Sequence, residues 1–260
     1  MTAAFALSID GMLCRGDRPI PGVREFMAAL RARRLPFRFV TNNSAHVPAF
    51  YAVRLNRMGF GVGEKDILSS AVAAIRFLKD RRPGKTVWPI ATPAVCAEIA
   101  AAGVPTSTGG HRPDIVLLAF DTTVDYEKLN AGYHYLQAGA ELIAIHPDDV
   151  CPTEDGYDVG IGPFIRLFEF LTGKKATAVG KPHRLMLDMA AADMGVPVAD
   201  VIMVGDRLSA DMHMAVDAGA RSILVLSEET DRTMLEQSGM HPTWVVDSVR
   251  GLIPWLAEFR

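Results

Sequence analysis

The chain has 260 residues, of which 49% are hydrophobic, so it can bury one large core or two modest ones. Its 27 basic and 30 acidic residues give a formal net charge of -3, which argues against nucleic acid or an anionic membrane as the main partner. No apolar run reaches the roughly 18 residues of a membrane span, and the first residues lack the pattern of a secretory signal, so we expect a cytoplasmic protein. The three cysteines show no Cys-x-x-Cys spacing and are expected to be reduced, mostly structural thiols: Cys14, Cys96 and Cys151.

The first elements along the chain alternate between strand and helix patterns. Apolar strands are predicted at residues 5–9 and 37–40, and helices at residues 23–34 and 48–59. This order is typical of a parallel sheet with right-handed crossovers. The middle of the chain repeats it, with strands predicted at residues 86–90, 115–119 and 141–145 and helices at 93–102 and 126–138.

The last part of the chain returns to the first pattern. Strands are predicted at residues 201–204, 222–226 and 244–246, with a helix near 209–218 and a short helix at the end. Gly, Pro and polar residues at 82–84 and around 147–163 mark the borders of the middle part. The predicted fold is α/β, with a doubly wound, Rossmann-like parallel sheet core (residues 1–79 and 179–260) and an inserted smaller α/β cap domain (residues 80–178).

Polar residues follow several of the predicted strands of the core. Ser8 and Asp10 end the first strand and point the same way, Thr41 ends the second, and Asp206 ends a late one. Ligands of open parallel sheets bind outside the carboxyl ends of the strands, where the strand order reverses. Lys181 precedes a predicted helix that starts at the same edge of the sheet. The sequence therefore predicts one crevice lined by these side chains.

The residue types in this crevice suit phosphoryl transfer, which needs donors and positive charge around the phosphoryl oxygens. Thr41 and Lys181 supply them, and Asn42 is an alternative donor. Magnesium prefers oxygen ligands, which Asp206, water and a backbone carbonyl provide. Asp211 is expected to orient a bound water or to hold the loop, and its structural alternative is a helix start favoured by the helix dipole.

Short motifs across nearly the whole chain resemble a known family. They are Arg15-Gly16 with Pro19-Ile20-Pro21-Gly22, Thr41-Asn42-Asn43-Ser44, Pro152-Thr153-Glu154-Asp155-Gly156, Val179-Gly180-Lys181-Pro182 and Val204-Gly205-Asp206-Arg207-Leu208. With the pair after the first strand, the chain resembles the haloacid dehalogenase (HAD) superfamily of phosphohydrolases, in its NagD-like, p-nitrophenylphosphatase-like branch with a type-II cap. The resemblance implies magnesium as cofactor and a phosphorylated small molecule, such as a nucleotide or sugar phosphate, as ligand.

The resemblance also implies a role for each site residue. Position 8 attacks phosphorus and binds metal, and Asp10 protonates the leaving group, later activates water, and contacts magnesium through its carbonyl oxygen. The implied sets are Ser8 and Asp10 for catalysis; Thr41, Asn42 and Lys181 for phosphate; Asp10, Asp206 and Asp211 for metal. In the cap, His146 replaces the expected asparagine and is predicted to contact substrate.

Ser8 departs from the family pattern, in which this position is the aspartate nucleophile. An alcohol is neither a nucleophile nor an anionic ligand until a base removes its proton. Losing a principal nucleophile costs about 10⁴ to 10⁶ in rate, and Asp10 is expected to lie about 6–7 Å away along the strand, too far for direct proton transfer. We predict a magnesium-dependent phosphomonoester hydrolase scaffold with weak or absent activity. The alternatives are a rare serine-based catalyst and a catalytically inert phospho-metabolite-binding or regulatory pseudo-phosphatase, whose serine is native or a deliberate substitution.

Two other functions fit the sequence less well. A receiver-type signalling domain also uses a strand-end acidic site with Thr and Lys, but it is much shorter and has no inserted cap. A dehalogenase has no use for the phosphate-holding set of Thr41, Lys181 and Asp206. Exposed faces of the cap offer a surface for a homodimer.

Overall fold

The computed structural model describes residues 3–107, 111–153, 156–227 and 229–259. A six-stranded parallel sheet has the order β14-β13-β12-β1-β4-β5. Its strands are β1 (Ala4–Leu7), β4 (Phe37–Thr41), β5 (Ile67–Ser69), β12 (Val201–Gly205), β13 (Arg221–Val225) and β14 (Trp244–Val246). The chain builds outward from β1 in one direction and returns to build outward from β12 in the other, so the strand order reverses between these two strands. This confirms the doubly wound sheet predicted from the two ends of the chain.

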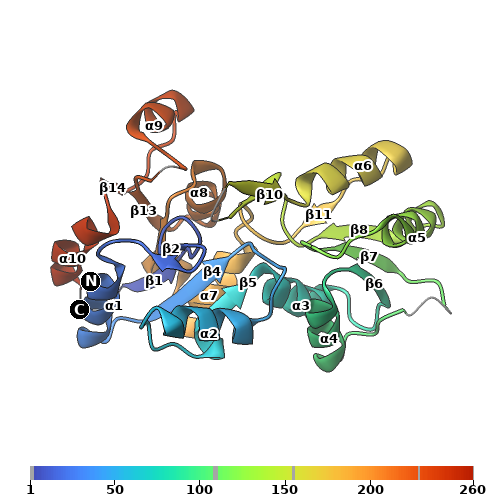
Figure 1. The fold of residues 1–260 in the computed structure, drawn as a ribbon, viewed down its shortest axis with the longest axis horizontal. Helices are drawn as coiled ribbons and strands as arrows, with labels where there is room; N and C mark the ends of the chain where they lie inside the picture. The colour runs from blue at the N-terminus through green and yellow to red at the C-terminus, as the bar shows by residue number, and fades with distance from the viewer. Residues whose placement is uncertain (1–2, 108–110, 154–155, 228, 260) are drawn as a thin grey trace.

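A smaller parallel sheet of four strands lies beside the first along the long axis of the molecule (Figure 1). Its order is β11-β8-β7-β6, from β6 (Val87–Ile90), β7 (Ile115–Leu118), β8 (Glu141–Ala144) and β11 (Thr177–Ala178). The predicted α/β cap inserted into the core is confirmed. Its limits at residues 80 and 178 stay a prediction.

Helices flank both sheets. They are α1 (Val23–Ala32), α2 (Pro48–Arg57), α3 (Ser70–Arg81), α4 (Pro93–Ala101), α5 (Tyr126–Gln137), α6 (Gly162–Thr172), α7 (Leu185–Met194), α8 (His213–Ala218), α9 (Arg232–Ser238) and α10 (Leu252–Trp255). The helix predicted near residues 209–218 begins as a π-helical turn over Leu208–Met212 before α8. The described helices include none that is both long enough and apolar enough to cross a membrane.

Side-chain alternation explains how β1 serves two cores. Phe5 and Leu7 point into the cluster that α1 covers, whereas Ala6 points into the cluster on the opposite face. The second cluster also contains Leu78 of α3 and Ile143 of β8. The core and the cap therefore share one continuous set of buried side chains.

Two short antiparallel hairpins project over the edge of the large sheet. The first is β2 (Cys14–Arg15) with β3 (Arg18–Pro19), and the second is β9 (Val150–Pro152) with β10 (Tyr157–Val159) from the cap. The amide of Thr153 donates to the carbonyl oxygen of Gly156 (2.8 Å) across the turn of the second hairpin. Glu154 and Asp155 of the predicted motif lie outside the described residues.

Candidate active site

Ser8 lies just beyond the end of β1, which ends two residues earlier than the predicted strand. Its amide donates to the carbonyl oxygen of Val204 on β12 (2.9 Å), so the neighbouring strand still fixes its backbone. Gly11 then turns the chain with a φ of 87°, and a Cβ atom at this position would collide with Oδ2 of Asp206. Glycine is therefore required where the loop after β1 passes the loop after β12.

Lys181 occupies the centre of the site. Its Nζ lies 2.6 Å from Oδ1 of Asp211, 3.2 Å from Oγ of Ser8 and 3.4 Å from the carbonyl oxygen of Val40. The side chains of Lys181 and Asp211 are 1% and 0% exposed, so this is a fully buried ion pair. The structure thus holds a cation within hydrogen-bond distance of Ser8, the position to which the resemblance assigns the nucleophile.

Besides its ion pair with Lys181, Asp211 binds the loop after β12. Its Oδ2 accepts from the amides of Asp206 and Arg207, both at 3.2 Å. Gly205 packs so closely on this carboxylate that a Cβ atom there would overlap it. These contacts match the loop-holding role considered from the sequence, and the role of Asp211 as a metal ligand stays a prediction.

Asn42 links the core to two other segments. Its Nδ2 donates to the carboxylate of Asp148 (3.0 and 3.1 Å) and to the carbonyl oxygen of Lys181 (3.0 Å), and its Oδ1 accepts from the amide of Lys181 (2.9 Å). Both sides of the amide group are therefore used in positioning Lys181 and Asp148. A direct contact of Asn42 with phosphate stays a prediction.

Thr41 lies in the same enclosed cavity as Ser8, Asp10 and Lys181. Its Oγ1 accepts from the amide of Asn43 (3.1 Å), which leaves the hydroxyl hydrogen to be donated elsewhere. The cavity has a volume of about 20 Å³, room for roughly one water molecule. Residues from β1, β4, the Lys181 loop and the cap thus converge on one small polar space.

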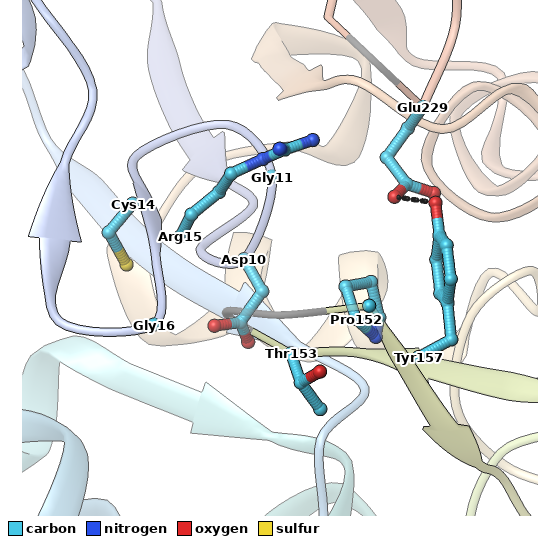
Figure 2. Close-up of a pocket in the computed structure, with 10 residues that line it drawn as sticks. Asp10, Gly11, Cys14, Arg15, Gly16, Pro152, Thr153, Tyr157 and Glu229 are labelled. Atoms are coloured by element: carbon cyan, nitrogen blue, oxygen red, sulfur yellow. Dashed lines mark hydrogen bonds between the residues drawn. The ribbon is translucent and has the colours of Figure 1, made fainter.

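A larger cavity of about 310 Å³ adjoins this site, and Figure 2 shows its lining. Asp10 and Pro152 line both cavities. On one side, Tyr157 of β10 donates from its hydroxyl to Oε1 of Glu229 in the loop after β13 (2.8 Å, Figure 2). The cap hairpin and the core therefore enclose a space next to Asp10 for the rest of a ligand.

Arg54 is a site residue that the sequence did not reveal. Its Nη1 lies 3.0 Å from Oδ1 of Asp10, its Nε lies 3.2 Å from Oδ1 of Asp17, and its other Nη donates to the carbonyl oxygen of Gly16. Burial opposes the charge, but Asp10 and Cys14 together hold the pKa of Arg54 above its usual value. Its spacing along α2 was a signal in the sequence. Arg54 follows Tyr51, which is buried, by three residues, so both side chains lie on the face of the helix that packs on the core.

Asp206 presents an unpaired carboxylate oxygen. Its Oδ2 accepts from Oγ of Ser227 (3.0 Å), while Oδ1 is buried with no hydrogen-bond partner among the described residues. Burial, and then the charge of Asp211, raise the pKa of Asp206 to about 7. A buried oxygen of this kind fits a divalent cation, which would replace the missing partner. No group of three or more His, Cys, Asp or Glu side chains that could hold a metal occurs in the described parts of the chain.

The cap contributes two charged or polar side chains that pair at the site: His146, predicted from the sequence, and Asp148, which pairs with Arg207 of the core. Oδ2 of Asp148 lies 3.2 Å from Nη2 of Arg207, and the amide of Asp148 donates to Nδ1 of His146 (3.3 Å). Although burial opposes it, the charges of Asp148, Asp211 and Asp206 raise the pKa of Arg207 above its usual value. Pairing of Asp148 with Arg207 was not predicted, because it depends on how the cap docks on the core.

Comparisons with known proteins agree with this geometry. The family model "Haloacid dehalogenase-like hydrolase" matches residues 5–105, and a second HAD-like hydrolase model matches residues 178–252. Glycerol-3-phosphate phosphatase of Homo sapiens is 30% identical over 95% of this chain and 88% of its own length. The chain belongs to the HAD-like hydrolase family.

Solved structures of this family place the chain in its NagD-like branch. A 4-nitrophenylphosphatase from Thermotoga maritima is 32% identical, with a TM-score of 0.91 over 96% of both chains. A putative nagD protein is 30% identical, with a TM-score of 0.88 over 95% of this chain and 96% of its own. A glycerol phosphate phosphatase from Mycobacterium tuberculosis, solved in complex with calcium, is 28% identical, with a TM-score of 0.85 over 96% of this chain and 74% of its own.

Proposed function

We propose that this HAD-like protein binds a small phosphomonoester, of the sugar phosphate or nucleotide type, on a magnesium-dependent hydrolase scaffold whose turnover is weak or absent. The observation that carries the proposal is the 3.2 Å separation of Lys181 Nζ from Ser8 Oγ inside a buried polar cavity. A phosphate cradle is kept around position 8, while the group that forms the covalent bond in the family is missing.

Lys181 and Thr41 hold the phosphoryl group in this proposal. Because their cavity of about 20 Å³ holds roughly one water molecule, it has to widen, or to open into the larger cavity beside it, to admit the group. The ammonium group of Lys181 is fixed by its ion pair with Asp211, and the hydroxyl of Thr41 has a hydrogen to donate. Donors that are already oriented lose little entropy when the anion binds. Asn42 supports the cradle by holding the backbone of Lys181.

Asp10 lies where the two cavities meet, which suits a group that protonates the leaving oxygen. Arg54 orients its carboxylate. The rest of the substrate would occupy the cavity of about 310 Å³ between the cap hairpin and the core.

The metal site of the proposal rests on Asp206. Its unpaired Oδ1, together with the carbonyl oxygen of Asp10 and water molecules, would hold Mg²⁺. When bound, Mg²⁺ supplies positive charge beside the phosphoryl oxygens. Ser8 offers a neutral hydroxyl instead of a carboxylate, so the site is expected to bind Mg²⁺ more weakly than a site with aspartate at this position. Asp211 is expected to act through Lys181 and the loop amides.

Among the described residues, the hydrogen-bond partner of the Ser8 hydroxyl is the ammonium group of Lys181 and not a base. The cation nearest to its hydroxyl, Lys181, is paired with Asp211, and Asp10 is paired with Arg54. An alcohol that keeps its proton is a poor nucleophile toward phosphorus. These contacts also favour the second candidate function, a catalytically inert pseudo-phosphatase that senses a phosphorylated metabolite.

Calorimetric titration with inorganic phosphate, combined with a magnesium-containing assay of a phosphomonoester panel, tests the proposal. We expect the unaltered protein to bind phosphate and to turn over the panel at or near background, and we expect Thr41→Val and Lys181→Met to weaken binding. Thr41→Val serves as the milder variant, because Lys181→Met leaves the buried carboxylate of Asp211 without its partner. Robust turnover by the unaltered chain, or no phosphate binding, would show the proposal to be wrong.

A further inference from the structure

One side chain that lines the small cavity has a polar atom without a partner among the described residues. His146 follows β8, lines the cavity together with Ser8, Thr41 and Lys181, and is 2% exposed. Across the segments that the structure describes, its Nε2 finds no hydrogen-bond partner. The great majority of buried polar groups in proteins have a hydrogen-bond partner. An unpaired group in a residue that lines a ligand cavity therefore indicates that the ligand supplies the partner.

The other ring nitrogen fixes the position of the hydrogen. Nδ1 accepts from the amide of Asp148 (3.3 Å), so Nδ1 carries a lone pair and the neutral ring carries its hydrogen on Nε2. Burial lowers the pKa of His146 to about 4, with Asp148 opposing and Arg207 and Lys181 adding to the shift. At neutral pH the unpaired atom is therefore an N–H donor.

The charged side chains around the ring include donors for an anion, although the carboxylates of Asp10 and Asp148 line the same cavity. Lys181 and Arg207 line the same cavity, and each is paired with a carboxylate. Ser8 stands where the family has an additional carboxylate, so no negative charge at position 8 repels an incoming phosphoryl group. The oxygens of phosphate accept hydrogen bonds, which is what an N–H donor, an ammonium group and a hydroxyl require together.

We propose that Nε2–H of His146 donates a hydrogen bond to a phosphoryl oxygen of the bound ligand, so that the cap completes the phosphate site of the core. The inference rests on the proposed function, because it assumes a phosphorylated ligand in this cavity. It goes further by assigning a cap residue to the phosphoryl group itself rather than to the leaving group.

Two substitutions test the roles of the two ring nitrogens separately. His146→Asn keeps an acceptor near Nδ1 for the amide of Asp148 and removes the donor at Nε2, whereas His146→Gln places an amide N–H near Nε2. In calorimetric titrations with inorganic phosphate in magnesium-containing buffer, we expect the Asn variant to bind about tenfold or more weakly and the Gln variant to stay within about threefold of the unaltered protein. Equal binding by the Asn variant and the unaltered protein would overturn the inference.

Nitrogen NMR of the unaltered protein gives a test that needs no variant. Before phosphate is added, the ring should show the neutral form with hydrogen on Nε2, and the Nε2 signal should shift on titration with phosphate. Phosphate binding without a change at Nε2 overturns this inference and leaves the proposed function standing. Absence of phosphate binding to the unaltered protein overturns the proposed function and this inference with it.

Discussion

At the scale of single residues, Asp206 couples protonation, metal binding and stability. Burial and Asp211 raise its pKa to about 7, so the folded protein binds this proton more tightly than the unfolded chain, where the pKa is near 3.8. The stabilising contribution of the protonated group is complete below the unfolded pKa and is lost as the pH rises through about 7. Magnesium binds the ionised carboxylate, so it should restore stability above that pH.

Thermal unfolding with and without magnesium tests this coupling. Without divalent cations we expect the Tm to fall as the pH rises through about 7, and we expect magnesium to raise the Tm more at about pH 8 than at about pH 6. Asp206→Asn should flatten both effects. A magnesium shift of the same size at both pH values would contradict this account of Asp206.

Arg54 should matter most for substrates with poor leaving groups. In a Ser8→Asp background, Arg54→Met removes the ion pair that orients Asp10. Protonation of the leaving group by a general acid raises reaction rates about 10²- to 10⁴-fold. We expect a loss of roughly tenfold or more in kcat/KM on alkyl phosphates and a much smaller loss on p-nitrophenyl phosphate, whose leaving group needs no proton. Steady-state assays with both substrates measure the two losses in kcat/KM and their ratio. The exposed Arg57 on the same helix provides the control substitution, Arg57→Met, and equal losses on both substrates would reject the positioning role of Arg54.

The sequence predicted the meeting of Ser8, Asp10, Thr41 and Lys181, because residues that follow parallel strands gather at one edge of the sheet. Their chemical roles stay predictions. The ion pair of Arg54 with Asp10 was not predictable in the same way, since it depends on the rotation of α2 about its axis and on the path of the loop after β1.

At the scale of secondary-structure elements, the hairpin of β9 and β10 forms one wall of the large cavity. The hydroxyl of Tyr157 donates a hydrogen bond to Glu229 of the core, and this bond is exposed to solvent. Tyr157→Phe should change the free energy of unfolding by less than about 1 kcal/mol and increase hydrogen exchange over residues 150–159. Exchange mass spectrometry measures this, with Tyr126→Phe on the exposed side of α5 as the control. Unchanged exchange over the hairpin would mean that other contacts hold it.

Elements with strong periodicity were predicted within a few residues of their ends, whereas the helices α3, α6 and α9 were missed. In α3, Ala71, Ala74, Ile75 and Leu78 are spaced as an apolar stripe, but two of the four are alanine, which marks a buried face only weakly. In α6, Gly162 and Pro163 suggested a border, but proline is well tolerated in the first turn of a helix.

At the scale of the whole molecule, the shared core predicts that the two sheets unfold as one cooperative unit. Leu78 of α3 is 2% exposed and belongs to the cluster that joins β4 of the core to β8 of the cap. Leu78→Ala should lower the free energy of unfolding by about 2–5 kcal/mol and leave a single transition. Denaturation followed by circular dichroism and by fluorescence of Trp88 in the cap tests this, with Trp244 and Trp255 replaced by Phe. Two separate transitions would show that the sheets unfold independently.

The core built from both ends of the chain was predictable, because the order of strands and helices in the first part of the chain recurs in the last part. The shared core was not, because it depends on α3, which the sequence did not reveal. The predicted homodimer and the domain limits stay predictions.

Phosphate release by the Ser8→Asp variant tests the central claim most directly: the scaffold keeps a working phosphate and metal site and lacks only its nucleophile. The unaltered protein, Ser8→Ala, Ser8→Asn and Ser8→Asp should be assayed side by side with magnesium on p-nitrophenyl phosphate and a panel of sugar phosphates and nucleotides. We predict magnesium-dependent release by Ser8→Asp at about 10⁴-fold or more above the other three. If Ser8→Asp folds and binds magnesium yet releases no phosphate, or if the unaltered protein is as active as Ser8→Asp, the account is wrong.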